Sequence, residues 1–302
     1  MSGAVLTIPA ARQGPGSVPQ QVVDALDLVV GRRTAGVMPG DRRAAGVGTG
    51  TELAQLRPYE PGDDVRHLDP AATARTGEPH VRVHVPERTL TTWIVLDVSP
   101  SMAFGTANRL KSDVAEGVAL VVARLAVRRA GRVALMTFGA GSRQLLPPHA
   151  SRRGWTAIRA ALKGGVAADG THEPTALADA LIHVRKIAGQ PGLVVLVSDL
   201  REQDGWVAAL RALRARHSVL VVEPRDPREA ALPAVGHLVL VDPETGTLVE
   251  ADTSSHELRA KFARIEAEGR ADVTRELRRL RVEHVVLSTG DDWLRELGRT
   301  LR

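Results

Sequence analysis

The chain has 302 residues, of which 43% are apolar, so it can form one large domain or two smaller ones with a substantial core. Its net charge is only +5 and its arginines are interspersed with acids, which argues against a nucleic-acid-binding protein. The absence of cysteine excludes disulfides, thiolate zinc sites and thiol catalysis.

The apolar runs of the sequence are all shorter than the stretch of about 18 residues that a membrane helix requires. Residues 2–21 also lack the charged-then-apolar pattern of a signal peptide. We therefore expect a cytoplasmic protein without a membrane span.

Residues 1–90 precede the regular part of the chain. We expect residues 1–16 to be a flexible tail, because glycine, proline and alanine occur there without periodicity. Residues 17–90 are expected to form an N-terminal extension. It comprises a helix from Ser17 to Gly31, a connector rich in glycine and arginine over residues 32–50, and a strand over residues 80–85, where polar and apolar residues alternate.

From residue 91 to residue 302, apolar strands alternate with amphipathic helices, which is typical of a parallel sheet with helices on both faces. Strands are expected at residues 93–97, 132–138, 193–197, 219–222 and 284–287, with a short edge strand at 143–146. Helices are expected at residues 109–130, 153–162, 175–188 and 205–215, followed by an arginine-rich helix ending near residue 280 and a terminal helix. A hairpin turn is expected at residues 242–246. The predicted fold class is α/β, with a doubly wound, mostly parallel sheet.

Polar residues follow two of the apolar strands. The strand at residues 93–97 leads into Asp97-Val98-Ser99-Pro100-Ser101, which places one carboxylate and two hydroxyls at alternate positions. These are hard oxygen ligands of the kind that Mg²⁺ prefers. The strand at residues 193–197 is followed by Ser198 and Asp199. Ligands of doubly wound sheets lie beyond the carboxyl ends of strands, so both aspartates stand where a ligand is expected.

This pattern resembles the von Willebrand factor A-like domain, a Rossmann-type fold with a metal-ion-dependent adhesion site. In that family D-x-S-x-S is followed by a threonine in a loop before a helix, and by an aspartate after a later strand. The resemblance implies that Mg²⁺, or alternatively Mn²⁺ or Ca²⁺, is held by Asp97, Ser99, Ser101, Thr175 and Asp199. It further implies a protein partner that supplies an acidic side chain to the ion.

The threonine ligand has two candidates, Thr171 and Thr175, in the loop over residues 169–175. Thr175 is preferred, because it begins a segment, Thr175–Leu181, that resembles the family's threonine and L-x-x-A-L helix. The loop departs from the usual Gly-Gly-Thr, since Pro174 precedes this threonine.

A second resemblance rests on the segment from Glu52 to Asp69, together with residues 74–77, 81–83 and 87–88. With Ser198-Asp199 and the hairpin at 242–246, it is similar to the Domain of Unknown Function fifty-eight family from about residue 48 to the C-terminus. The resemblance implies a partnership with a MoxR-type AAA+ ATPase in assembling or maturing other complexes. The chain departs from the family at Leu68-Asp69-Pro70, where Ile-Asp-Trp is common.

The same segment contains Pro61-Gly62-Asp63-Asp64, which predicts a tight turn. We expect Arg66 to pair with Asp64 or Asp69. Two interpretations remain for the segment, a folding element and a docking surface for a partner.

Three functions are compatible with these features, and we favour a non-enzymatic, metal-dependent protein-interaction module. A metal-assisted phosphoester hydrolase is the first alternative, because aspartates at strand ends beside Mg²⁺ also serve phosphoryl transfer. Against it, the sequence lacks a G-x-S-x-G elbow, a Walker-type glycine loop, an H-E-x-x-H motif and a D-x-D pair at the first strand. The second alternative is a metal-free scaffold of the same fold.

Overall fold

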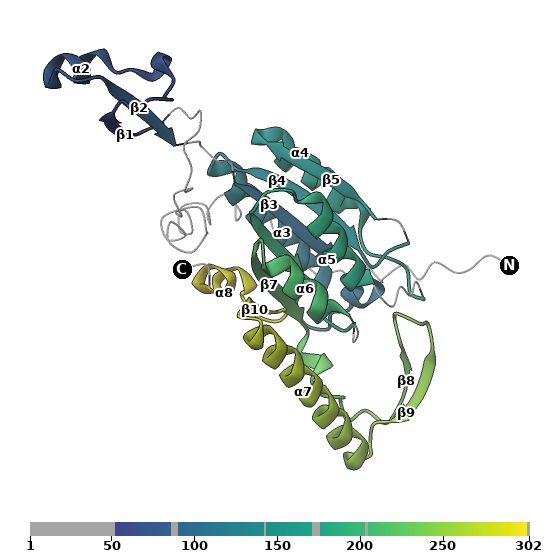
Figure 1. The fold of residues 1–302 in the computed structure, drawn as a ribbon. Coiled ribbons are helices and arrows are strands. Elements are labelled where there is room, and N and C mark those ends of the chain that lie inside the picture. Colours follow the sequence, from purple (N-terminus) through teal and green to yellow (C-terminus); the bar gives the residue numbers. More distant parts are fainter. Residues whose placement is uncertain (1–51, 86–89, 142, 171–175, 203–204, 301–302) are drawn as a thin grey trace. The chain divides into compact units, whose positions relative to one another are not determined.

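The computed structural model describes residues 52–85, 90–141, 143–170, 176–202 and 205–300 (Figure 1). The chain divides into a smaller unit of residues 39–89 and a larger unit that contains residues 90–302. The expected tail, the helix at 17–31 and both candidate threonines, Thr171 and Thr175, lie outside the described residues.

The smaller unit is built on two antiparallel strands, β1 (Glu52–Pro58) and β2 (His80–Val85), with η2 (Val65–His67) and α2 (Pro70–Thr76) between them. The predicted strand at 80–85 is confirmed. The turn before η2 is held by Asp63, whose two carboxylate oxygens accept hydrogen bonds from Arg57 at 2.7 and 2.8 Å.

Asp69 connects α2 to β2. Its carboxylate caps the helix by accepting the Ala72 N–H and also pairs with Arg82 Nε at 2.7 Å. Pro70 occupies the first helical position, where the missing N–H costs nothing. In this described segment the expected ion pair of Arg66 is wrong: Asp69 is taken by Arg82, and Asp64 accepts only the backbone N–H of Arg66. These contacts favour the folding interpretation of the segment.

The larger unit is built on a six-stranded sheet with the order β10-β7-β6-β3-β4-β5. Every neighbouring pair is parallel except β4 and β5. The strands are β3 (Thr91–Asp97), β4 (Arg132–Phe138), β5 (Leu145–Ala150), β6 (Leu193–Val197), β7 (Ser218–Arg225) and β10 (Glu283–Ser288).

The edge strand β5 differs from its expected position at 143–146, because it begins at Leu145 and continues to Ala150. Pro147 and Pro148 read as strand breakers, since neither can donate to a ladder. An edge strand tolerates proline because one side of it has no neighbouring strand.

Helices cover both faces of the sheet. One face packs against α3 (Lys111–Arg128), α4 (Ser151–Ala161) and α8 (Trp293–Thr300), and the other against α5 (Ala176–Ile187), α6 (Trp206–Arg214) and α7 (His256–Arg279). Along β3, Ile94 and Leu96 face the first core, and Trp93 and Val95 face the second. The predicted fold class, an α/β protein with a doubly wound, mostly parallel sheet, is confirmed. None of the helices in the described ranges has the length and apolar character needed to cross a bilayer.

A hairpin lies outside the central sheet. It consists of β8 (His237–Val241) and β9 (Leu248–Asp252), which pair only with one another in the described part of the chain. Its tip is the turn expected at residues 242–246, with Gly246 in the left-handed conformation (φ 70°). Figure 1 shows the hairpin standing apart from the strands of the sheet.

Candidate metal centre at the carboxyl ends of β3 and β6

The winding direction of the sheet reverses at β3, because β4 lies on one side of it and β6 on the other, both parallel to it. In sheets of this kind a crevice forms outside the carboxyl ends of the strands at the reversal. Leu96 of β3 is paired with Val197 of β6, so Asp97 and Ser198 leave the sheet at neighbouring positions. The two polar segments predicted from the sequence therefore meet.

The side chains of Asp97, Ser99 and Ser101 converge in the loop after β3. Asp97 Oδ1 accepts the Ser99 N–H at 2.9 Å, and the Ser99 and Ser101 hydroxyl oxygens are 3.1 Å apart. All three residues are buried, with exposed fractions of 5–8%. Gly139, after β4, makes this packing possible, because a Cβ there would lie only 2.7 Å from the Cβ of Ser99.

The segment after β6 adds two further oxygen groups. Ser198 Oγ donates a hydrogen bond to Asp97 Oδ2 at 2.6 Å, which fixes the orientation of that carboxylate. Asp199 is 3% exposed and interacts with the Ser101 side chain. The chain then turns sharply, with Leu200 in the left-handed conformation (φ 53°).

A buried lysine that no sequence pattern singled out lies against Asp199. Lys111, the first residue of α3, is fully buried and donates to Asp199 Oδ2 and Glu229 Oε1, both at 2.7 Å. Burial alone lowers the pKa of Lys111, but the two carboxylates outweigh it and hold this pKa above its usual value. Burial likewise acts to raise the pKa of Asp199, and the charge of Lys111 brings it below its ordinary range. The only available signal was that Lys111 is one of just four lysines in the chain.

Asp97 differs from Asp199, because no basic side chain within the described ranges pairs with it. Burial, followed by the charge of Asp199, raises the pKa of Asp97 to about 7, although hydrogen bonds from Ser198 and Ser99 oppose this shift. A cation beside such a carboxylate stabilises its ionised form. The buried oxygens of Asp97, Ser99 and Ser101 thus form a donor set that fits a hard divalent ion.

The hydroxyls are essential to this fit. Within the described ranges, no group of three or more histidine, aspartate or glutamate side chains could hold a metal ion. A metal-binding role therefore requires Ser99 and Ser101 together with Asp97, and Asp199 is already engaged by Lys111.

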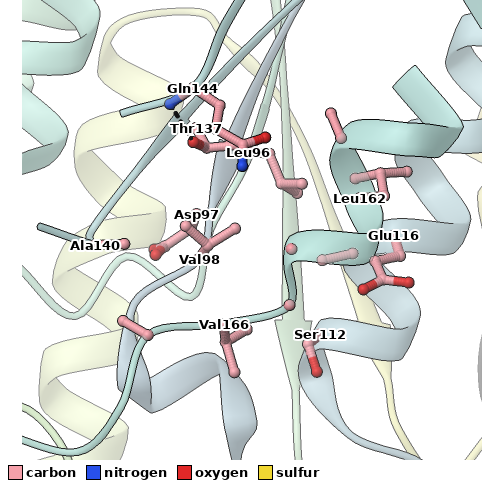
Figure 2. A pocket seen from close by; sticks show the side chains of 15 residues that line it. Leu96, Asp97, Val98, Ser112, Glu116, Thr137, Ala140, Gln144, Leu162 and Val166 are labelled. Carbon is pink, nitrogen blue, oxygen red and sulfur yellow. Dashed lines mark hydrogen bonds between the residues drawn. The ribbon is translucent and has the colours of Figure 1, made fainter. Parts of the chain in front are cut away.

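A small pocket of about 120 Å³ lies beside Asp97. Figure 2 shows Asp97 on one side of it and Ser112 and Glu116 of α3 on the other. Burial, followed by the charge of Asp113, raises the pKa of Glu116 to about 7. The volume suffices for a few water molecules but falls below the roughly 300 Å³ of a typical small-molecule site.

The structure describes four of the predicted ligands, Asp97, Ser99, Ser101 and Asp199, and brings them together. The fifth, Thr175, and its alternative, Thr171, lie outside the described residues. The sequence pointed to Ser198 only as the neighbour of Asp199 after the strand at 193–197, not as a ligand, and it did not point to Lys111.

Known proteins resemble this chain in sequence and in fold. The "Uncharacterized protein Rv1480" of Mycobacterium tuberculosis is 37% identical over 276 residues, covering 91% of this chain and 86% of the relative. The conserved hypothetical protein BatB from Bacteroides thetaiotaomicron is similar in structure, with a TM-score of 0.42, 16% identity and coverage of 70% of this chain and 97% of BatB. A von Willebrand factor type A protein from Catenulispora acidiphila gives a TM-score of 0.35 and 14% identity, over 45% of this chain and 33% of that protein.

The family described as "Protein of unknown function DUF58" matches residues 55–272, which is more than two thirds of the sequence. This match agrees with the resemblance carried by the segment from Glu52 to Asp69 and by Ser198-Asp199. Together with the relative from Mycobacterium tuberculosis, it places the sequence in a family: the chain belongs to the DUF58 proteins.

Proposed function

We propose that this protein is a non-enzymatic, divalent-metal-dependent interaction module that acts with a MoxR-type AAA+ ATPase in the assembly or maturation of other protein complexes. One observation carries the proposal: the oxygens of Asp97, Ser99 and Ser101 converge where the winding of the sheet reverses. The preferred ion is Mg²⁺, with Mn²⁺ or Ca²⁺ as substitutes. The cytoplasmic location remains a prediction from the sequence.

The contacts around the site support ion binding. Asp97 supplies one anionic oxygen, and Ser198 orients it through a 2.6 Å hydrogen bond. Ser99 and Ser101 supply neutral hydroxyls 3.1 Å apart. Lys111 offsets the charge of Asp199, so the described ligands carry little net negative charge. When bound, Mg²⁺ would supply a positive charge with exchangeable positions that a partner's aspartate or glutamate could take.

A binding role is favoured over catalysis because the pocket beside Asp97, at about 120 Å³, is small for an organic substrate. The MoxR-type ATPase is proposed as the partner on the sequence resemblance alone, which implies such a partnership. Thr175 remains the predicted additional hydroxyl ligand.

The proposal predicts that a MoxR-type ATPase co-purifies with the tagged full chain in Mg²⁺ and is lost when EDTA is added. Asp97→Asn should reduce the amount of ATPase retained by at least about tenfold, because it keeps the shape of the side chain but removes its charge. Quantitative mass spectrometry of the retained proteins measures this amount. Circular dichroism and the melting temperature establish that the variant is folded.

Asp272→Asn is the matched control, because Asp272 is an exposed acid of α7 and should leave retention unchanged. If EDTA does not reduce the amount of ATPase retained, or if Asp97→Asn retains as much ATPase as the wild type, the metal dependence is contradicted. If no sample contains a MoxR-type ATPase, the proposed partner is contradicted. Turnover of a generic aryl phosphate that disappears in Asp97→Asn would instead support a hydrolase.

A further inference from the structure

The tip of the β8–β9 hairpin, residues 242–246, contacts the loops of the candidate metal centre. Glu244 Oε1 accepts the Ser101 N–H at 3.2 Å, although the two residues are 143 positions apart in the chain. Beside this contact, the Pro243 carbonyl accepts the Gly170 N–H at 2.8 Å. The hairpin therefore brings a carboxylate of the same chain to the loop that carries Ser99 and Ser101.

Hydrogen bonds within the tip hold its backbone, so the point from which the Glu244 side chain extends is fixed. Asp242 accepts the Glu244 N–H at 3.1 Å and the Thr245 hydroxyl at 2.7 Å through its carboxylate. The Asp242 carbonyl also accepts the Gly246 N–H at 2.8 Å. This side-chain-to-backbone bonding is the usual way in which aspartate fixes a turn.

The hairpin is anchored at its base and largely exposed along its length. At the base, the buried Thr253 bonds through its hydroxyl and its N–H to the Gly236 carbonyl, at 2.7 and 2.8 Å. Between base and tip, Val239, Leu248 and Val249 are all more than half exposed. An isolated two-stranded sheet is marginally stable in water. The hairpin is thus anchored at its base, and a few polar contacts at its tip hold it against the site.

We propose that Glu244 is an internal acidic ligand for the ion at Asp97, Ser99 and Ser101, presented by the hairpin at the position that a partner's carboxylate would otherwise take. The inference rests on the proposed function, since it requires a metal-binding site. A partner's carboxylate then has to displace the hairpin tip, so Glu244 competes with the partner for the same position on the ion.

A purely structural role of Glu244 can be separated from this proposal. Ser101 lies near the start of η3 (Pro100–Ala103), where any acceptor oxygen can satisfy a free N–H. Glu244→Gln retains such an oxygen but removes the charge that an ion would attract. If Glu244 only accepts the Ser101 N–H, the substitution should leave ion binding unchanged. If Glu244 is a ligand, the substitution should weaken ion binding.

The test is a titration of the full chain with Mn²⁺ alone, followed by the electron paramagnetic resonance signal of the free ion. Wild-type protein is expected to bind Mn²⁺, Glu244→Gln about tenfold more weakly, and Asp97→Asn not at all. Glu250→Gln is the matched control, because Glu250 is an exposed acid of β9, and it should bind as the wild type does. In hydrogen exchange, Mn²⁺ should slow the amides of residues 237–252 in the wild type but not in Glu244→Gln.

Equal affinity of wild type and Glu244→Gln, with binding lost in Asp97→Asn, overturns the role of Glu244 and leaves the metal site in place. Exchange of residues 237–252 that is unaffected by Mn²⁺ in the wild type also overturns it. If the wild type binds no Mn²⁺, the proposed function fails, and the internal ligand fails with it.

Discussion

Replacement of Lys111 by methionine is expected to lower the free energy of unfolding by about 3–5 kcal/mol at pH 7. The ammonium of Lys111 is the shared partner of Asp199 and Glu229, at 2.7 Å from each, and its side chain is fully buried. Without it the two carboxylates keep only the partly exposed Arg201 as a counter-charge, at 3.9 Å from Asp199 and 3.2 Å from Glu229. Urea unfolding followed by circular dichroism measures the loss.

The double variant Lys111→Met/Asp199→Asn should recover part of this stability, because it also removes one of the two buried carboxylate charges that Lys111 pairs with. We expect a coupling free energy of about 1–3 kcal/mol from the double-mutant cycle. Lys261→Met, at an exposed position of α7, is the matched control and should change the stability by no more than about 0.5 kcal/mol. A loss of less than about 1 kcal/mol for Lys111→Met would show that Asp199 does not depend on this lysine.

Glu223→Gln is expected to cost about 3 kcal/mol at pH 7. Glu223 is fully buried in β7 and accepts hydrogen bonds from His284 at 2.8 Å, Arg225 at 2.5 and 2.9 Å, and Arg270 at 3.0 Å. Burial acts to raise the pKa of Glu223, but these partners outweigh it and lower the pKa from 4.5 to about 2. Because the folded-state pKa is depressed, the stabilisation is present above pH 4.5 and is lost as the pH falls towards 2.

The difference in unfolding free energy between wild type and Glu223→Gln should therefore shrink to less than half by about pH 3. Urea unfolding at a series of pH values from 7 to 3 measures this difference. Glu268→Gln, an exposed acid of α7, should show no such pH dependence. A difference for Glu223→Gln that is constant over the whole range would mean that shape, and not charge, accounts for the loss.

The central strands and the serine loop were predictable because their signals are local. A strand covered on both faces must be apolar at every position, so Trp93–Leu96 and Leu193–Val197 stand out as continuous apolar runs. The polar residues that follow them, Asp97 after the first run and Ser198-Asp199 after the second, then lie at the strand ends by necessity. Because β3 and β6 pair in parallel, these strand ends lie side by side.

The charged partners of the site were not predictable in this way. Lys111 is 88 residues from Asp199 and 118 from Glu229, and Glu244 is 143 residues from Ser101. Local periodicity contains no information about such pairs, since they form only when α3, η5 (Pro227–Glu229) and the hairpin fold onto the same edge of the sheet. The expected ion pair of Arg66 was wrong for the same reason, because Asp69 pairs with Arg82 on β2 instead.

The most direct measurement is anomalous X-ray diffraction from crystals of the full chain grown in Mn²⁺. A peak is predicted within about 2.2 Å of the oxygens of Asp97, Ser99 and Ser101, in keeping with an oxygen-ligated divalent ion. Absence of a peak at these side chains, with their oxygens bonded only to protein and water, would contradict the metal-dependent account.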